Sequence, residues 1–233
     1  MISLDNVTLA AIDGVGTDLN TVRALKYSMN GIKYKDIKYI TSGDYTPNFC
    51  KKISIPKLTW NDYNKFCLTD LKNYIDTEFV LLIQSDGFVI NPDKWCSTFL
   101  SYDYLGAPWP MSNLKHNIPR FPLVLQECLR TQKIHQIGNG GFTLRSKKLL
   151  EATAKLYKDE YYGIPEDLVI SNLMRDALET IGLKFTNDLE YAGKFSCEAK
   201  NIDGMYLSPE NSFGFHCKDT HRDKIQLLDN IKL

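Results

Sequence analysis

An acidic residue, Asp86, follows a run of five large apolar residues, Phe79–Ile83, and precedes a glycine. Such a run is too short to cross a membrane and is typical of a strand buried on both faces of a parallel sheet. Ligands of open α/β sheets bind beyond the carboxyl ends of the strands, where Asp86 would lie. We interpret Asp86 as a residue that helps to hold a divalent metal carrying a nucleotide diphosphate. The alternative is an ordinary Asp-Gly turn.

A glycine-rich segment, residues 137–146, has three glycines within four positions: Gly138, Gly140 and Gly141. Glycines gather in this way where the backbone takes positive φ angles or where a ligand approaches it closely. A helix should follow, with Ser146 as its cap. The segment lacks the Gly-Lys-Ser/Thr ending of a P-loop, which excludes that phosphate site.

A second strand end carries Asp13 and Val15, after the apolar run of residues 7–12. Glycines flank Val15, but the third glycine of a dinucleotide-binding fingerprint is missing. Because this strand should share a sheet edge with Asp86, a nucleoside base could lie beside Asp13 and Val15. A plain turn between strand and helix is the alternative.

Two adjacent acids, Glu166 and Asp167, follow Pro165 at the predicted start of a helix. Acids in this position interact favourably with the helix dipole, which is reason enough for both to be there. His216 lies near the end of the chain and, as an isolated histidine, is more often structural than a ligand.

The remaining pattern predicts an α/β fold in which strands and helices alternate. Strand, helix and strand over residues 7–40 form a βαβ unit. We expect irregular chain over residues 48–59 and over much of residues 111–133. The other expected elements are helices over residues 61–75, 91–100, 124–130, 147–157, 167–180 and 220–233, and short strands at residues 142–145, 183–185 and 195–197.

The composition is that of an ordinary globular protein, with 43% apolar and 24% charged residues. Lys+Arg and Asp+Glu both number 28, so a net charge of zero argues against nucleic acid as a partner. No apolar run has the length of a transmembrane helix, and the first residues do not resemble a signal peptide. The six scattered cysteines are then expected as free thiols in a cytoplasmic protein.

Four ordered motifs together resemble a little-characterised family of predicted nucleotide-sugar glycosyltransferases of the GT-A type. They are Gln-Ser-Asp-Gly at 84–87, Asp-Tyr-Leu-Gly-Ala-Pro-Trp at 103–109, Gly-Asn-Gly-Gly-Phe-Thr-Leu-Arg-Ser at 138–146 and Pro-Glu-Asp at 165–167. The resemblance implies one GT-A-like domain over residues 1–233. Its sheet would be Rossmann-like, mixed and mainly parallel, with helices on its faces.

The resemblance also implies a metal site. Asp86 looks like the second acid of an Asp-x-Asp motif, and His216 looks like the late histidine ligand of such enzymes. Gln84 stands where the first acid would be, which removes one charged ligand. Mn²⁺ or Mg²⁺ suits oxygen ligands, and Mn²⁺ accepts a histidine better. Gln84 and Ser85 would then line the donor site beside Asp86.

For the reaction, the resemblance implies that Asp167 is the base of an inverting transfer, with Glu166 orienting it or bonding the acceptor. Gly140 and Gly141 would let the donor sugar approach the backbone. Lys218 or Arg145 could meet phosphate, although both could equally be surface charges.

The expected function is therefore metal-dependent transfer of a sugar from a nucleotide-diphosphate donor. The acceptor would be a hydroxyl of a glycan, a lipid-linked glycan or a glycoprotein, and contact with a membrane face stays open. Two alternatives remain: a non-catalytic module that binds a nucleotide sugar or carbohydrate, and a hydrolase that uses Asp86 and Asp167 as paired carboxylates.

Overall fold

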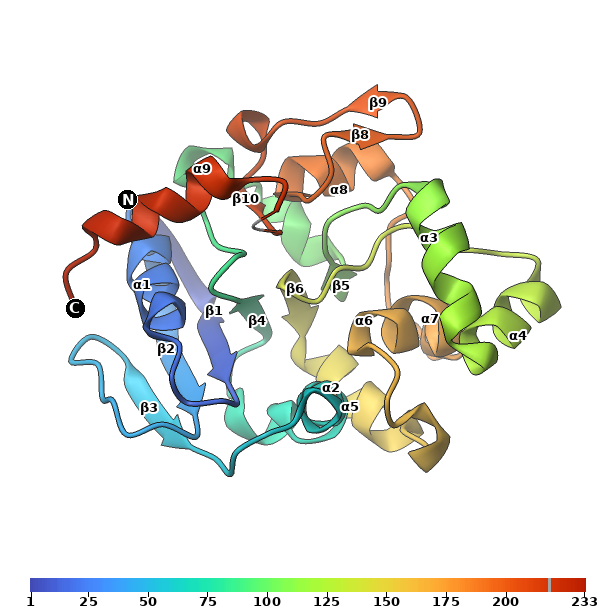
Figure 1. Cartoon of the computed structure of the whole chain (residues 1–233), viewed down its shortest axis with the longest axis horizontal. Coiled ribbons are helices and arrows are strands. Elements are labelled where there is room, and N and C mark those ends of the chain that lie inside the picture. Colours follow the sequence, from blue (N-terminus) through green and yellow to red (C-terminus); the bar gives the residue numbers. More distant parts are fainter. Residues whose placement is uncertain (218) are drawn as a thin grey trace.

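The computed structural model describes residues 1–217 and 219–233. Its main sheet has the strand order β3-β2-β1-β4-β6-β5 (Figure 1). β1 to β4 run parallel to one another, while β6 runs antiparallel to both of its neighbours. The predicted mixed, mainly parallel sheet is confirmed. The strands are β1 Ile2–Asp13, β2 Ile32–Thr41, β3 Lys51–Ser54, β4 Phe79–Ile83, β5 Tyr104–Leu105 and β6 Phe142–Ser146.

Helices and two small strand pairs surround this sheet. β7, Ser196–Cys197, pairs in parallel with β10, Gly214–Phe215. β8, Asn201–Ile202, and β9, Met205–Tyr206, form a hairpin. The α-helices are α1 Leu19–Ser28, α2 Trp60–Thr69, α3 Met111–Asn117, α4 Pro122–Thr131, α5 Lys147–Leu156, α6 Glu166–Leu168, α7 Arg175–Thr180, α8 Leu189–Phe195 and α9 Arg222–Ile225. Within the described chain, none is long and apolar enough to span a bilayer.

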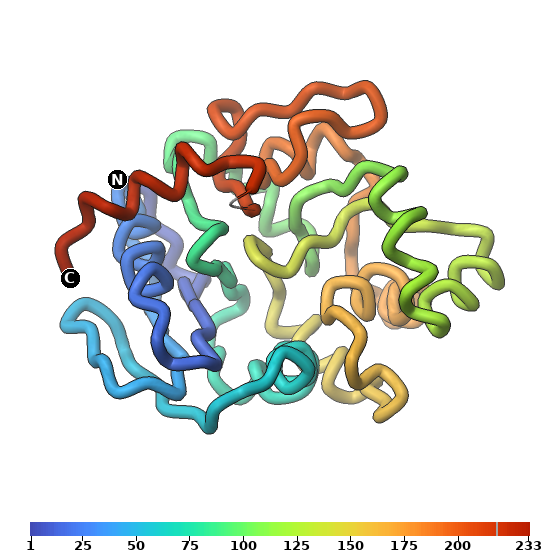
Figure 2. The backbone as a smooth tube through the Cα atoms, viewed as in Figure 1, coloured from blue at the N-terminus to red at the C-terminus, as the bar shows by residue number. Residues whose placement is uncertain are grey.

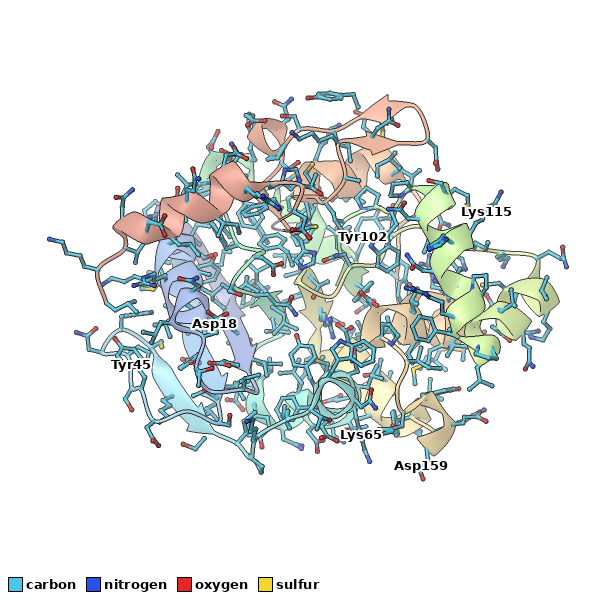
Figure 3. The ribbon with its side chains drawn as sticks, in the orientation of Figure 1. Asp18, Tyr45, Lys65, Tyr102, Lys115 and Asp159 are labelled. Carbon is cyan, nitrogen blue, oxygen red and sulfur yellow. The ribbon has the colours of Figure 1, made fainter. Side chains whose placement is uncertain are left out.

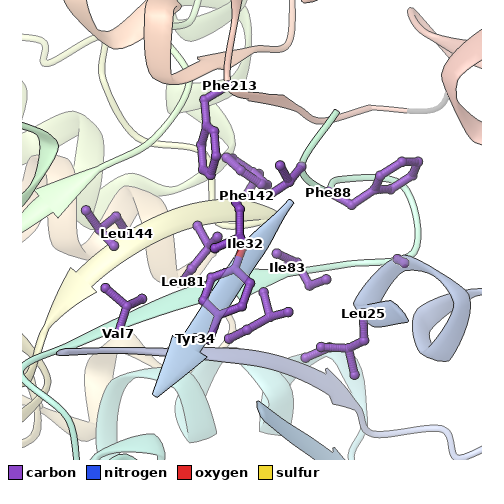
Figure 4. Packing of buried hydrophobic residues seen from close by; sticks show 14 of the residues in the cluster. Val7, Leu25, Ile32, Tyr34, Leu81, Ile83, Phe88, Phe142, Leu144 and Phe213 are labelled. Atoms are coloured by element: carbon purple, nitrogen blue, oxygen red, sulfur yellow. The ribbon is translucent and has the colours of Figure 1, made fainter. Parts of the chain in front are cut away.

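The central strand β4 is buried on both faces, as predicted. Leu81 and Ile83 belong to one hydrophobic cluster, and Val80 and Leu82 to another on the opposite face. Figure 4 shows Leu81 and Ile83 among the apolar side chains of their cluster. Because alternate side chains of a strand point to opposite faces, β4 needs a covering layer on each side. Its carboxyl end, where the chain turns at Gln84, is thereby held firmly.

The βαβ unit is confirmed, since β1 and β2 are parallel and α1 connects them. The side chain of Asp18 accepts a hydrogen bond from the backbone N–H of Asn20 and so caps α1. Figure 3 labels Asp18 at this end of the helix. The chain also returns to this unit at its end: Figure 2 shows the final segment running past α1, with both termini on the same side of the molecule.

The single helix expected over residues 91–100 is instead two separate 3-10 turns, Pro92–Lys94 and Ser97–Ser101, and three other expectations about local structure are also wrong. The segment expected to be irregular at residues 48–59 contains β3, which extends the sheet beyond β2. The stretch 111–133 is mostly helical: it contains α3 in addition to the expected helix α4. Residues 183–185 do not form a strand and only place Phe185 in a single bridge with Tyr104.

The helix predicted over residues 167–180 is interrupted. α6 passes into a π-helical turn, Val169–Leu173, before α7 begins. In this turn the side-chain oxygen of Asn172 accepts a hydrogen bond from the backbone N–H of His135, at 3.0 Å. π-helical turns often occur at functional sites. Here the turn ties the helix that follows Asp167 to the chain that leads into the glycine-rich segment.

Candidate functional site

A cleft of about 530 Å³ opens where β1 and β4 end. Its lining includes Asp13, Val15 and the consecutive residues Gln84, Ser85 and Asp86. The sequence placed all five on one sheet edge, and the structure brings them into one cleft. Because β1 and β4 are adjacent and parallel, their carboxyl ends must meet there.

Asp13 organises one wall of this cleft. One carboxylate oxygen accepts a hydrogen bond from the backbone N–H of Gly16, at 2.7 Å. The other accepts from the backbone N–H of Asp18, at 3.2 Å, and from the hydroxyl of Tyr39, at 2.8 Å. These three bonds shape the turn that carries Val15, whose side chain is 58% exposed. Asp13 therefore builds the wall from behind, whereas Val15 presents an apolar surface to the cleft.

The turn after β4 is closed by two backbone hydrogen bonds between Gln84 and Gly87. The amide nitrogen of the Gln84 side chain donates to the hydroxyl of Tyr63, at 2.9 Å. Gln84 is thus held against α2, while Ser85 and Asp86 form the tip of the turn. The backbone oxygen of Asp86 accepts a hydrogen bond from the N–H of Cys217, which joins this turn to the chain after β10.

The imidazole of His216 lies between two carboxylates. Its Nε2 is 3.6 Å from Oδ1 of Asp86, and its Nδ1 is 3.5 Å from Oε1 of Glu198. Burial disfavours the charged imidazole, but hydrogen bonds and charges from Asp86 and Glu198 outweigh it and raise the pKa of His216 to about 10. His216 and Asp86, which the resemblance pairs as ligands, are therefore close enough to share one ion.

The backbone of residues 139–141 encloses the same ring. The amide nitrogen of Asn139 is 2.8 Å from Nδ1 of His216, and its side-chain oxygen accepts from the N–H of Gly141. A methyl group on Gly141 would collide with the His216 ring, and one on Gly87 would press on the ring from another side. The glycines therefore make room for this histidine.

Glu166 fills the corresponding space at Gly140. A side chain on Gly140 would collide with its carboxylate. Glu166 is buried and pairs with Arg145, at 2.5 Å between Oε1 and Nη2. Gly140 and Gly141 were expected to leave space for the donor sugar. On the side where a Cβ atom would stand, this space holds Glu166 at Gly140 and His216 at Gly141.

Asp167 lies half-buried on the other side of Gly140. Its Oδ2 accepts a hydrogen bond from the N–H of Gly140, at 3.0 Å, and its Oδ1 accepts from the N–H of Leu168, at 2.7 Å. Burial, followed by the charge of Glu166, raises the pKa of Asp167 to about 7, although these two hydrogen bonds oppose the rise. A carboxyl group with such a pKa exchanges its proton readily near neutral pH.

Arg145 and Lys218 are the two residues suggested as phosphate contacts. Arg145 is fully buried and pairs with Glu166, so its expected role as a phosphate contact or a surface charge is wrong. Its place on β6, a strand covered on both faces, explains the error. Lys218 lies outside the described residues.

Sequence reasoning missed Glu198 and Trp60. Glu198 directly follows β7, and His216 directly follows β10, the parallel partner of β7, so both leave the sheet at the same end. The rule that pointed to Asp86, an acid after an apolar run, does not find Glu198, because β7 consists only of Ser196 and Cys197. Trp60 begins α2 and lines the cleft with 58% of its surface exposed. No sequence pattern shows that a tryptophan at the start of a helix lines a cleft.

Comparisons with known proteins bear on the family and the fold. A family model described as "Protein of unknown function (DUF5672)" matches residues 53–216. No curated protein matches the chain. Among solved structures, an active-site mutant of LgtC is similar with a TM-score of 0.52 and 14% identity, covering 96% of this chain and 94% of that one. A glycosyltransferase involved in glycosylation of the major capsid of PBCV-1 has a TM-score of 0.51 and 13% identity, with coverages of 96% and 98%. The fold is that of GT-A glycosyltransferases.

The first prediction concerns Asp13. In Asp13→Asn, one carboxylate oxygen becomes an NH₂ group, which cannot accept a hydrogen bond. At least one of the three groups that now donate to the carboxylate would then lose its acceptor. We expect the free energy of unfolding to fall by about 2 kcal/mol, as for a buried donor left without an acceptor. Urea denaturation measures it. The exposed Asp44→Asn serves as the control, and equal stabilities of the two variants would contradict the structural role of Asp13.

Proposed function

We propose that this chain, which belongs to the family described as Protein of unknown function (DUF5672), is a nucleotide-sugar-dependent glycosyltransferase. The observation that carries the proposal is the meeting of Asp86, His216 and Asp167 around residues 139–141, at the end of a cleft on the carboxyl edge of the sheet. Residues 1–233 would act as one catalytic domain. The acceptor would be a hydroxyl of a glycan, a lipid-linked glycan or a glycoprotein.

The cleft supports a nucleoside diphosphate as the donor's carrier. Trp60 and Val15 offer exposed apolar surface, and a base can stack on an aromatic face regardless of its hydrogen-bonding pattern. Ser85 and Asp86 also line the cleft, and a diphosphate beside them would reach the ligand pair. The base would then lie near β1 and the reacting sugar near His216.

The donor set fits one divalent ion. Atoms 3.6 Å apart, such as Asp86 Oδ1 and His216 Nε2, can both reach a single Mn²⁺ or Mg²⁺ at bonding distance once the imidazole has released its proton to make room for the metal. No group of three acidic, histidine or cysteine side chains suited to a metal occurs in the described part of the chain, so the diphosphate must supply further ligands. When bound, such an ion neutralises charge on the leaving diphosphate. A histidine in the set favours Mn²⁺.

Asp167 would act as the general base. In its ionised form it takes the proton of the acceptor hydroxyl while that oxygen forms a bond to the anomeric carbon of the sugar. The bond from the anomeric carbon to the diphosphate oxygen breaks, and the nucleoside diphosphate leaves with that electron pair. Attack opposite the leaving group inverts the configuration, and the bond from Gly140 N–H keeps the carboxylate aimed during the step.

A binding module without turnover is the second candidate. The observation that favours it is Gln84, which stands in place of an acid and is turned toward Tyr63. Such a module would bind a nucleotide sugar in the same cleft but release it unchanged. Donor binding without any product therefore separates the two.

The second prediction concerns the metal. We expect nucleoside diphosphates to raise the melting temperature only when Mn²⁺ or Mg²⁺ is present, because binding to the folded state stabilises it. Asp86→Ala should abolish this shift and sugar transfer while the protein stays folded. Asp93→Ala, on the surface, is the matched control. A screen of nucleotides with metal that yields no shift for the parent would count against the proposal.

The third prediction concerns Trp60. Trp60→Ala should weaken binding of the nucleoside diphosphate about tenfold, because one base–aromatic stack contributes roughly 1–3 kcal/mol. Isothermal titration calorimetry measures the change. Tyr206→Ala removes an exposed aromatic ring from β9 and should leave the affinity as it is. Equal affinities of the two variants would place the base elsewhere.

The fourth prediction concerns pH. Asp167 must be ionised to accept a proton, and its pKa of about 7 implies that activity is lost as the pH falls through this value. Below it, kcat/KM should drop about tenfold per pH unit. Asp167→Asn should abolish transfer and with it this limb of the profile. A parent profile that is flat between pH 6 and 8 would exclude Asp167 as the base.

A further inference from the structure

Arg145 is a fully enclosed cation in the middle of β6. Its Nε donates to the hydroxyl of Thr143, at 3.0 Å, and its Nη2 donates to Oε1 of Glu166, at 2.5 Å. The guanidinium also lies 5.6 Å from the ring centroid of Tyr104, which is buried as well. Arg145 therefore reaches neither solvent nor the cleft, and its only charged partner is Glu166 among the ion pairs of the described residues.

Glu166 extends this pair into the site. Its second oxygen, Oε2, accepts a hydrogen bond from the backbone N–H of Asp167, at 2.8 Å. Its own N–H donates to the side chain of Asn64 on α2, at 2.9 Å. One oxygen of the carboxylate is bonded to Arg145 and the other to the backbone N–H of Asp167. These two bonds fix the orientation of the carboxylate.

The contacts close into a circuit. Glu166 holds the backbone of Asp167, the Asp167 carboxylate accepts from the N–H of Gly140, and Gly140 packs against the Glu166 carboxylate with no room for a side chain. A shift of Glu166 would therefore move Asp167 and Gly140 together. Arg145 is the member that fixes the circuit to the central sheet.

This pair is costly if stability alone is considered. Removing two charges from water carries a large penalty, and replacing a buried ion pair with apolar side chains of similar volume is often neutral or stabilising. The surroundings of Arg145 include apolar groups, because Val80 and Tyr104, which lie opposite it on the two neighbouring strands, belong to hydrophobic clusters. Stability alone therefore gives no reason for a charged pair at this place in the fold.

We propose that Arg145 and Glu166 are positioning residues that set the place and the proton affinity of Asp167 through the Gly140 circuit. Glu166 then does not bond the acceptor, because its side chain is buried, whereas that of Asp167 is partly exposed. Burial is the largest cause of the raised pKa of Asp167, and the negative charges of Glu166 and Glu198 add to it, so Glu166 shifts the pH at which Asp167 becomes a base. The inference depends on the proposed function only for the reaction that Asp167 serves.

The test follows the Gly140 amide by NMR, which needs no substrate. In the parent protein, the chemical shift of this N–H should change with pH with a midpoint near 7, because the N–H donates to the Asp167 carboxylate. Glu166→Gln keeps the size of the side chain but removes the charge. We expect the midpoint to move to lower pH, and the acid limb of kcat/KM to move with it.

A double variant separates positioning from stability. Arg145→Met combined with Glu166→Leu replaces both charges with apolar chains of similar volume. We expect it to stay folded, while the Gly140 amide loses its titration and kcat falls by about a hundredfold with little change in the donor KM. Should this variant fail to fold, Glu166→Gln still decides the matter by its midpoint.

Arg175 supplies the matched control. It is also buried, donates to Oε1 of Glu179 at 2.8 Å and lies 4.2 Å above the ring of Phe185, with no contact to the Gly140 circuit in the described structure. Arg175→Met should lower stability and leave the Gly140 titration as it is. An unchanged midpoint in Glu166→Gln, or a folded double variant whose Gly140 amide titrates like that of the parent, overturns the inference.

The two proposals fail in different ways. If the NMR midpoints move as expected but no sugar nucleotide is turned over, the positioning circuit stands and the glycosyltransferase proposal does not. If transfer occurs but Glu166→Gln leaves the midpoint unchanged, the enzyme stands and the circuit does not.

Discussion

The site depends on how closely two side chains approach the backbone of residues 139–141. His216 occupies the space beside Gly141, and Glu166 occupies the space beside Gly140. These two side chains come from segments about 50 residues apart in the sequence, and each would be displaced by a single methyl group on its glycine. The glycine-rich segment is therefore the place where the two halves of the candidate site are kept in register.

The two halves differ in their electrostatics. On one side, the carboxylates Asp86 and Glu198 surround an imidazole and raise its pKa. On the other, Glu166 and burial raise the pKa of Asp167, so that its proton is held more tightly. Negative charge thus favours the protonated form of both groups, the imidazole of His216 in one half and the carboxyl of Asp167 in the other. In the proposed transfer, Asp167 must release its proton to act as a base, and His216 must release its own to bind a metal.

Burial of the sheet explains where Asp86 and the Arg145–Glu166 pair are located. β4 and β6 are covered on both faces, and a charge on either must be paired inside the protein or leave at a strand end. Asp86 lies in the turn after β4 and is half-buried, whereas Arg145 lies within β6 and pairs with Glu166. The same sheet therefore provides an accessible acid and an enclosed ion pair on neighbouring strands, because β4 pairs with β6 and Val80 lies opposite Arg145.

The strands that carry the site, and their order along the chain, could be predicted from the amino-acid sequence. Apolar runs followed by an acid indicated β1 and β4, and local sequence signals indicated α1, α4 and α5, because such signals lie within a few consecutive residues. Which polar residues meet could be seen only in the folded chain. Arg145 became an internal partner of Glu166, Glu198 joined His216, and Trp60 reached the cleft, since these contacts depend on strand pairing and helix packing between segments far apart in the chain. The edge strand β3 and the π-helical turn after α6 were missed for the same reason: each is stabilised by distant neighbours and has little pattern of its own.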